Sequence, residues 1–189
     1  MPAFHHDQLL ALAGRLLKLD QRKPRQANLK RALSTAYYAL FHLLVHEGVY
    51  YLVGQAPFRS FLARAFSHAD MLTAATTFRT ASLVDLASAK AFKGPAKAQG
   101  KQHASQKSTV PTLVAVPPAL NQVAETFVLL QETRHQADYD VNRRFSRKEA
   151  EALVVQAVDA FAGWRTVRKT DAARFLLLAM LVGGRSRNR

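Results

Sequence analysis

Apolar residues recur along this chain at the spacing of amphipathic helices and not of strands. At about 100° of rotation per residue, Leu9, Leu12 and Leu16 share one face of a helix predicted over residues 7–19. The same period predicts four more helices and a shorter final one, over residues 25–53, 57–80, 118–140, 146–164 and 170–182. No strand pattern rises above noise, so the expected fold is an all-α, up-and-down bundle of about five helices.

Turn and capping residues mark the boundaries between these elements. Pro24 and Pro118 suit the first turn of a helix, and Ser146 with Glu149 forms a capping-box signal. Residues 88–112 instead are rich in Ser, Ala, Lys, Gln and Gly, which predicts a flexible basic insertion. We therefore expect residues 1–169 to form the bundle, interrupted by that insertion, and residues 170–189 to form a short helix and a basic tail.

Two of the predicted helices place polar residues on inward faces. One stripe of the 25–53 helix is apolar: Leu33, Tyr37, Leu40, Phe41 and Leu44. A separate narrow stripe is mixed: Arg31, Thr35, Tyr38, His42 and His46. In the 118–140 helix, Arg134 and Asp138 continue the apolar stripe of Leu120, Phe127 and Leu130. Buried polar groups are costly without partners, so the two helices are expected to bring these groups together.

The residues of these two stretches resemble a known family. The run Arg-Ala-x-Ser-x-Ala-Tyr-Tyr-Ala-x-Phe-His at residues 31–42 and the run Arg-x-x-Ala-Asp-Tyr at residues 134–139 resemble the HEPN (higher eukaryotes and prokaryotes nucleotide-binding) domains, in their prokaryotic branch. Residues 62–71 are similar to that branch's middle segment. The resemblance implies a helical bundle, usually a homodimer, that binds RNA or nucleotides, in some cases within a toxin–antitoxin or defence system.

The resemblance also implies a site and two partners. It places RNA or nucleotide binding in a cleft lined by a defined set: Arg31, Tyr38, His42, Arg134, Asp138 and Tyr139. In some members a tyrosine just behind the motif is modified by a partner minimal nucleotidyltransferase, which would correspond to Tyr139. Ribonuclease members carry Arg, four to six residues and then His, and no histidine of this chain follows an arginine at that distance. The resemblance therefore favours binding over RNA cleavage.

Two alternatives to simple binding stay open. The first is a divergent ribonuclease or toxin subunit that uses His42 or His135 together with Arg134. The second is a non-catalytic helical interaction module, in which the Arg134–Asp138 pair only fixes helix register. Although His42 and His46 have the i,i+4 spacing of zinc-binding helices, no third ligand is spaced nearby, so no metal or other cofactor is expected.

Charge and composition narrow the partners further. The net charge is +14 and the pI is near 10.7, which favours a polyanionic partner, although a solubilising excess would also explain it. The absence of cysteine excludes disulfides and thiol chemistry and suits the cytoplasm. The longest apolar run, residues 175–182, is too short to span a bilayer, so we expect a soluble protein without a membrane partner.

Deleting residues 90–109 should leave the fold intact, because this segment has too few large apolar groups to contribute to a core. A thermal melt of the deletion variant should match that of the full chain within a few degrees. A large fall in melting temperature would show that the segment is packed against the bundle.

Overall fold

The computed structural model describes residues 4–20, 22–53, 55–85 and 113–183. Within these ranges lie seven helices and two short strands: α1 (His5–Lys18), α2 (Gln26–Leu52), α3 (Ala56–Ala63), α4 (His68–Phe78), β1 (Leu83–Asp85), β2 (Leu113–Ala115), α5 (Pro118–Tyr139), α6 (Arg147–Val167) and α7 (Asp171–Val182). The predicted all-α fold is confirmed, with more helices than the five expected. The predicted basic insertion at 88–112 and the end of the tail lie outside the described residues.

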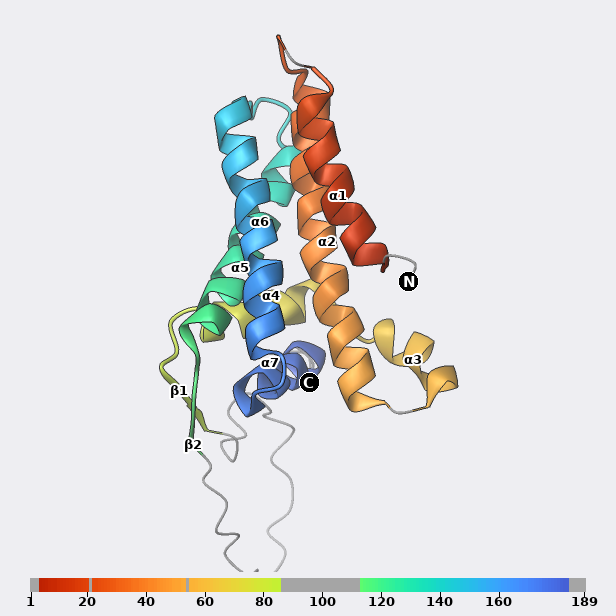
Figure 1. Cartoon of the computed structure of the whole chain (residues 1–189), viewed down its shortest axis with the longest axis vertical. Helices are drawn as coiled ribbons and strands as arrows, with labels where there is room; N and C mark the ends of the chain where they lie inside the picture. Colours follow the sequence, from red (N-terminus) through yellow and green to blue (C-terminus); the bar gives the residue numbers. More distant parts are fainter. Residues whose placement is uncertain (1–3, 21, 54, 86–112, 184–189) are drawn as a thin grey trace, which may run out of the picture.

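Helix α2 is the centre of the bundle, with α1, α5 and α6 packed along it (Figure 1). Its apolar stripe is fully buried at Leu33, Tyr37, Leu40 and Leu44, as the sequence period predicted. Facing side chains from α5 and α6, including Phe127 and Trp164, are also fully buried. A helix of 27 residues that is covered on several sides gives the site described below a rigid wall.

The single helix predicted over residues 57–80 is wrong, because the chain forms two helices there. Phe66 lies in the break and is buried, close enough to α2 that a Cβ atom on Gly48 would lie 2.6 Å from its ring. Ser67 then caps α4 by accepting a hydrogen bond from the backbone N–H of Asp70 at 3.1 Å. Burial of Phe66 and the new cap together redirect the chain, and α3 lies beside the end of α2 (Figure 1).

The expectation that the chain contains no strands is also wrong. β1 and β2 pair antiparallel, with Leu83 opposite Ala115 and Asp85 opposite Leu113. Three residues are too few for a period of two to stand out from the sequence. The pair is tied to the bundle by Asn121 of α5, whose side-chain amide donates to the carbonyl oxygens of Phe78 and Ala81 at 2.7 and 2.9 Å.

The final helix packs onto the bundle. α7 contacts α4 and α2, and the ring of Phe175 lies 6.1 Å from that of Phe78. Thr170 caps it by accepting a hydrogen bond from the N–H of Ala173 at 3.2 Å. None of the helices in the described ranges combines the length and apolar character that crossing a bilayer requires.

Ser146→Ala should lower the free energy of unfolding by about 1 kcal/mol, because both hydrogen bonds of the predicted capping box are present at the start of α6. Chemical denaturation measures the change. Ser146→Asp is the matched control, since aspartate is an equally good cap, and its stability should stay close to that of the unaltered chain. Equal losses in both variants would contradict a capping role.

Candidate functional site

The polar residues of the two sequence motifs meet where α2 and α5 lie side by side. Arg134 Nε donates a hydrogen bond to Asp138 Oδ2 at 3.0 Å, one turn further along α5. The hydroxyl of Ser34, on α2, donates to the same carboxylate oxygen at 3.3 Å. The Arg134 side chain is 17% exposed and that of Asp138 is 29% exposed. The prediction that the two motifs contact each other is therefore confirmed.

Three tyrosine rings surround the Arg134 guanidinium. Its central carbon lies 5.4 Å from the ring centre of Tyr38, 5.7 Å from Tyr37 and 5.9 Å from Tyr139. At these distances the ring faces attract a cation. Partial burial by itself would lower the pKa of Arg134, but the neighbouring Tyr38 and Asp138 raise it overall. The guanidinium is thus a fixed positive charge in a largely aromatic setting.

A second layer lies behind this ring of tyrosines. The Tyr37 hydroxyl lies 2.6 Å from His68 Nδ1 on α4 and donates to Gln131 Oε1 at 3.4 Å. Burial raises the pKa of Tyr37, and burial followed by the charge of Arg134 lowers the pKa of His68. Both groups are therefore held in their neutral forms, and they connect α2, α4 and α5 without adding charge to the site.

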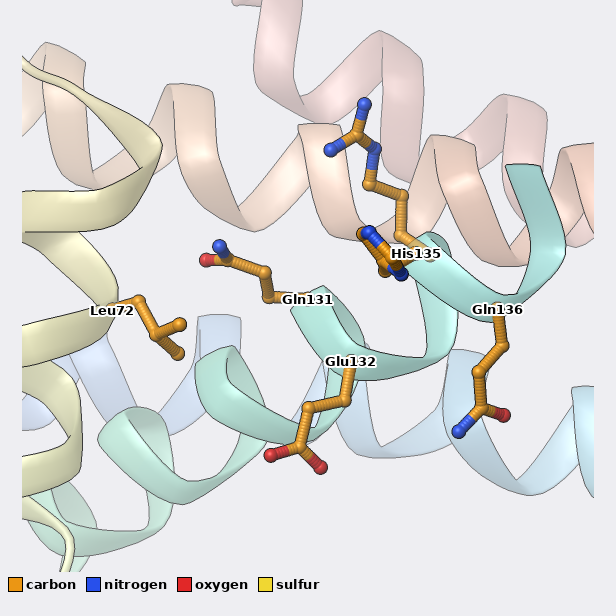
Figure 2. A pocket seen from close by; sticks show the side chains of 6 residues that line it. Leu72, Gln131, Glu132, His135 and Gln136 are labelled. Atoms are coloured by element: carbon orange, nitrogen blue, oxygen red, sulfur yellow. The ribbon is translucent and has the colours of Figure 1, made fainter. Parts of the chain in front are cut away.

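A cavity of about 330 Å³ opens beside Arg134, between α4 and α5. Polar residues supply all but one of the side chains that line it: Leu72, Gln131, Glu132, Arg134, His135 and Gln136. Figure 2 shows Leu72 reaching from α4 toward Gln131, while the other labelled side chains come from α5. The ring of His135 lies 4.9 Å from that of Tyr139, which is 65% exposed. The cavity therefore has a cation beside it and two accessible ring systems nearby.

Not every predicted site residue belongs to this cluster. Tyr38, Arg134, Asp138 and Tyr139 come together, but Arg31 is exposed and forms no hydrogen bond or ion pair with any described residue.

His42 is 6.4 Å from Tyr38, ring centre to ring centre, and packs more closely on His5 at 5.1 Å. It therefore lies beside the cluster and forms no hydrogen bond or ring contact with Arg134. Ser34, Tyr37, His68 and Gln131 belong to the site although they were not predicted in it. Ser34 and Tyr37 are part of the first motif, which was the available signal. Nothing in the sequence indicated that His68 or Gln131 belongs to the site, apart from their position in predicted helices.

A separate group of histidines lies between the start of α1 and the middle of α2. His6 and His46 are 5.2 Å apart, ring centre to ring centre, and both line an apolar cavity of about 290 Å³. Neither ring nitrogen of His46 has a hydrogen-bond partner among the described residues. Among the described residues, no three His, Asp or Glu side chains are arranged to hold a metal ion. These histidines pack chiefly against one another and against aromatic rings, including those of Phe4 and Tyr50.

No family model, curated protein or solved structure matches this chain. A function for this chain must therefore be inferred from the chemistry of its own residues.

The Arg134 cluster is arranged to receive an anion. The carboxylate of Asp138 takes only the Nε–H of Arg134, and no described residue accepts a hydrogen bond from the two terminal nitrogens. A guanidinium with its terminal N–H groups available offers two parallel donors, the geometry that carboxylate and phosphate groups accept. The accessible ring of Tyr139 offers a flat face within the same site.

Acid should destabilise the fold between about pH 7 and 5.5. Burial is the largest cause that lowers the pKa of His6, His42, His46 and His68, so the folded state holds them neutral. Below about pH 6.5 the unfolded chain binds protons more readily, and the stability that these groups contribute above that pH is lost. Denaturation at a series of pH values measures this slope.

The double variant His42→Gln/His46→Gln should show a shallower dependence of stability on pH over the same range. If the unfolding free energy of the unaltered chain stays constant, or rises, from pH 7 to pH 5.5, the histidine rings are not buried as described.

Proposed function

We propose that the protein binds RNA or a nucleotide at the Arg134 cluster, with a phosphate on the guanidinium and a base against the ring of Tyr139. The observation that carries this proposal is the state of Arg134: oriented through Nε by Asp138, with its terminal nitrogens left to a ligand. A phosphate ester with an attached base matches both parts of the site, because the guanidinium takes the anion and an exposed aromatic ring stacks on the base.

The charge of the chain supports the same class of ligand. A net charge of +14 raises the local concentration of polyanions and speeds their association. The resemblance of residues 31–42 and 134–139 to the HEPN domains adds independent support, since that family binds RNA or nucleotides. The homodimer, the nucleotidyltransferase partner and the role in a toxin–antitoxin or defence system stay predictions that depend on the resemblance alone.

Binding without cleavage is the better proposal for this site. The ribonuclease spacing of Arg and His is absent from the sequence, and in the described part of the chain His42 does not contact Arg134. His68 lies behind the cluster with its Nδ1 engaged by the Tyr37 hydroxyl, and His135, which lines the cavity together with Arg134, packs its ring against that of Tyr139. A base in the reaction would need an imidazole nitrogen directed at the phosphate. His42 and His68 are not placed for that role, so a ribonuclease that uses His135 with Arg134 stays the alternative.

A purely structural role fits the geometry less well. Arg134 and Asp138 lie on the same helix, so their ion pair cannot by itself align α5 with α2. The pair is linked to α2 by one hydrogen bond, from Ser34 at 3.3 Å, and by the contacts of the guanidinium with the Tyr37 and Tyr38 rings. A partly exposed i,i+4 pair contributes only about 0.3–0.5 kcal/mol to stability, which is small for a group whose role is to hold the fold.

Arg134→Ala should therefore lower the free energy of unfolding by only about 1 kcal/mol. It should weaken binding of single-stranded RNA and of adenosine monophosphate about tenfold to a hundredfold, because a charge-assisted bidentate contact is lost. Arg134→Lys should lose most of this binding as well, because an ammonium group cannot replace the fork. Fluorescence titrations and chemical denaturation provide the two measurements.

The control is Arg64→Ala, which removes an exposed arginine from the connection between α3 and α4. It should leave both binding and stability unchanged. The double variant Arg134→Met/Asp138→Leu distinguishes a ligand-binding role of the pair from a purely structural one, because it removes both charges and keeps the side-chain volume. Undiminished RNA and nucleotide binding by a folded double variant would refute the assignment of this pair to a ligand site.

A further inference from the structure

One end of the bundle concentrates basic residues from two distant parts of the chain. Residues 15–31 contain seven basic residues and a single acid, Asp20, and residues 143–148 contain four basic residues and no acid. Apart from Arg31, none of these basic residues was predicted to contact a ligand. We name their exposed members the basic pole: Arg15, Lys18, Arg22, Lys23, Arg25, Arg31, Arg144 and Lys148.

Specific hydrogen bonds hold the two segments together. The Arg147 guanidinium, at the start of α6, donates to the carbonyl oxygens of Leu17, at 3.1 Å, and Asp20. Gln26 exchanges two hydrogen bonds with the backbone of Phe145, at 2.8 and 2.9 Å. Figure 1 shows the α1–α2 connection and the start of α6 at the same end of the molecule. The basic pole is thus a built surface and not a pair of independent loops.

The carboxylates in this region already accept hydrogen bonds from the local backbone or pair with a neighbouring cation. Asp20 accepts hydrogen bonds from the Arg25 N–H at 3.0 Å and from the Asn28 side chain at 2.6 Å. The carboxylate of Asp140 accepts from two backbone N–H groups of its own loop, and Glu149 belongs to the capping box and pairs with Arg143.

The outer cations of the pole lack such compensation. Lys23, Arg144 and Lys148 form no ion pair with any described residue. Like charges gathered on one face repel one another and oppose folding, and a bound polyanion relieves that repulsion. Because the neighbouring carboxylates are already engaged by the local backbone, they do not neutralise these cations. The pole therefore has a positive electrostatic potential.

The pole and the Arg134 cluster belong to one surface along the seam between α2 and α5. Lys30 Nζ donates to the Asp140 carbonyl at 2.7 Å, and one turn further along α2 Ser34 donates to Asp138 at 3.3 Å. One helical turn advances about 5.4 Å, so the Arg134 cluster begins where the pole ends. Lys30, the neighbour of the pole member Arg31, therefore places a cation between the connecting loops and the exposed aromatic ring of Tyr139.

We infer that the basic pole is the track for the phosphate backbone of a single-stranded RNA whose bound nucleotide occupies the Arg134 cluster. The inference rests on the proposed function and extends it, because it makes an RNA strand, and not a free nucleotide, the ligand. An exposed aromatic ring at one end of a cationic track favours unpaired bases, which stack on such rings. An anionic membrane surface would use the same charges and leave that ring without a role.

The test compares two double variants that each remove one lysine and one arginine. Lys23→Gln/Arg144→Gln alters the pole, and Arg64→Gln/Lys169→Gln alters exposed positions in the α3–α4 and α6–α7 connections. The probes are a single-stranded RNA of about 20 nucleotides and adenosine monophosphate, titrated from about 50 to 200 mM salt. The pole variant should bind the RNA about tenfold more weakly, with a log–log salt slope shallower by about one. Its binding of adenosine monophosphate should be unchanged, and the control variant should match the unaltered chain with both probes.

Equal RNA affinity and equal salt slope in the two double variants would overturn the track, while the proposed function would stand if Arg134→Ala still lost both ligands. No binding of either probe by the unaltered chain would instead refute the proposed function itself. Vesicles of anionic phospholipid provide the third arm. Pole-dependent binding to vesicles, with RNA binding unaffected by the pole variant, would assign this surface to a membrane and overturn the inference.

Discussion

The charge of Arg134, partly withdrawn from water between three helices, is the constraint on which the rest of the site depends. A guanidinium in that position needs a counter-charge, and Asp138 supplies it through a single hydrogen bond to Nε. The same carboxylate accepts from Ser34 and so joins α5 to α2. Because Asp138 engages one edge of the guanidinium, the arginine is positioned while the terminal nitrogens stay available. The orientation of Arg134 and the proposed binding thus depend on the same carboxylate, that of Asp138.

Packing around this charge explains why the site is well defined. Tyr37 is fully buried, so its ring is fixed beside Arg134, and its hydroxyl is held by His68 of α4 and Gln131 of α5. The burial that fixes these groups also keeps them uncharged, and the positive charge of Arg134 acts against protonation of His68. The cluster therefore presents the Arg134 guanidinium, paired on one edge with Asp138 and surrounded by rings, at the side of a cavity.

The helical period was sufficient to predict the bundle and the contact between the two motifs. Tyr37 and Arg134 lie on apolar stripes, so the sequence placed both inward, and the structure brings them within 5.7 Å. The break at Phe66 was not predicted, because it depends on the tertiary space that Gly48 leaves on α2. His68 joins the site only through that break, since the cap at Ser67 sets where α4 begins. His42 was predicted in the cluster from its stripe and from the resemblance, and its packing against His5 lies outside what one helix can show.

The basic pole shows the same limit on a larger scale. Composition revealed the excess of charge, but its concentration at one end depends on contacts such as Arg147 with Leu17, which are 130 residues apart in the chain.

The central claim is that Arg134 receives the anionic group of a nucleotide. Nuclear magnetic resonance of arginine Nε–Hε groups tests it most directly, with the Arg134 signal assigned by its loss in Arg134→Lys. Titration with adenosine monophosphate should shift that signal first and furthest. An Arg134 signal that stays fixed while the arginines of the basic pole move would contradict the account.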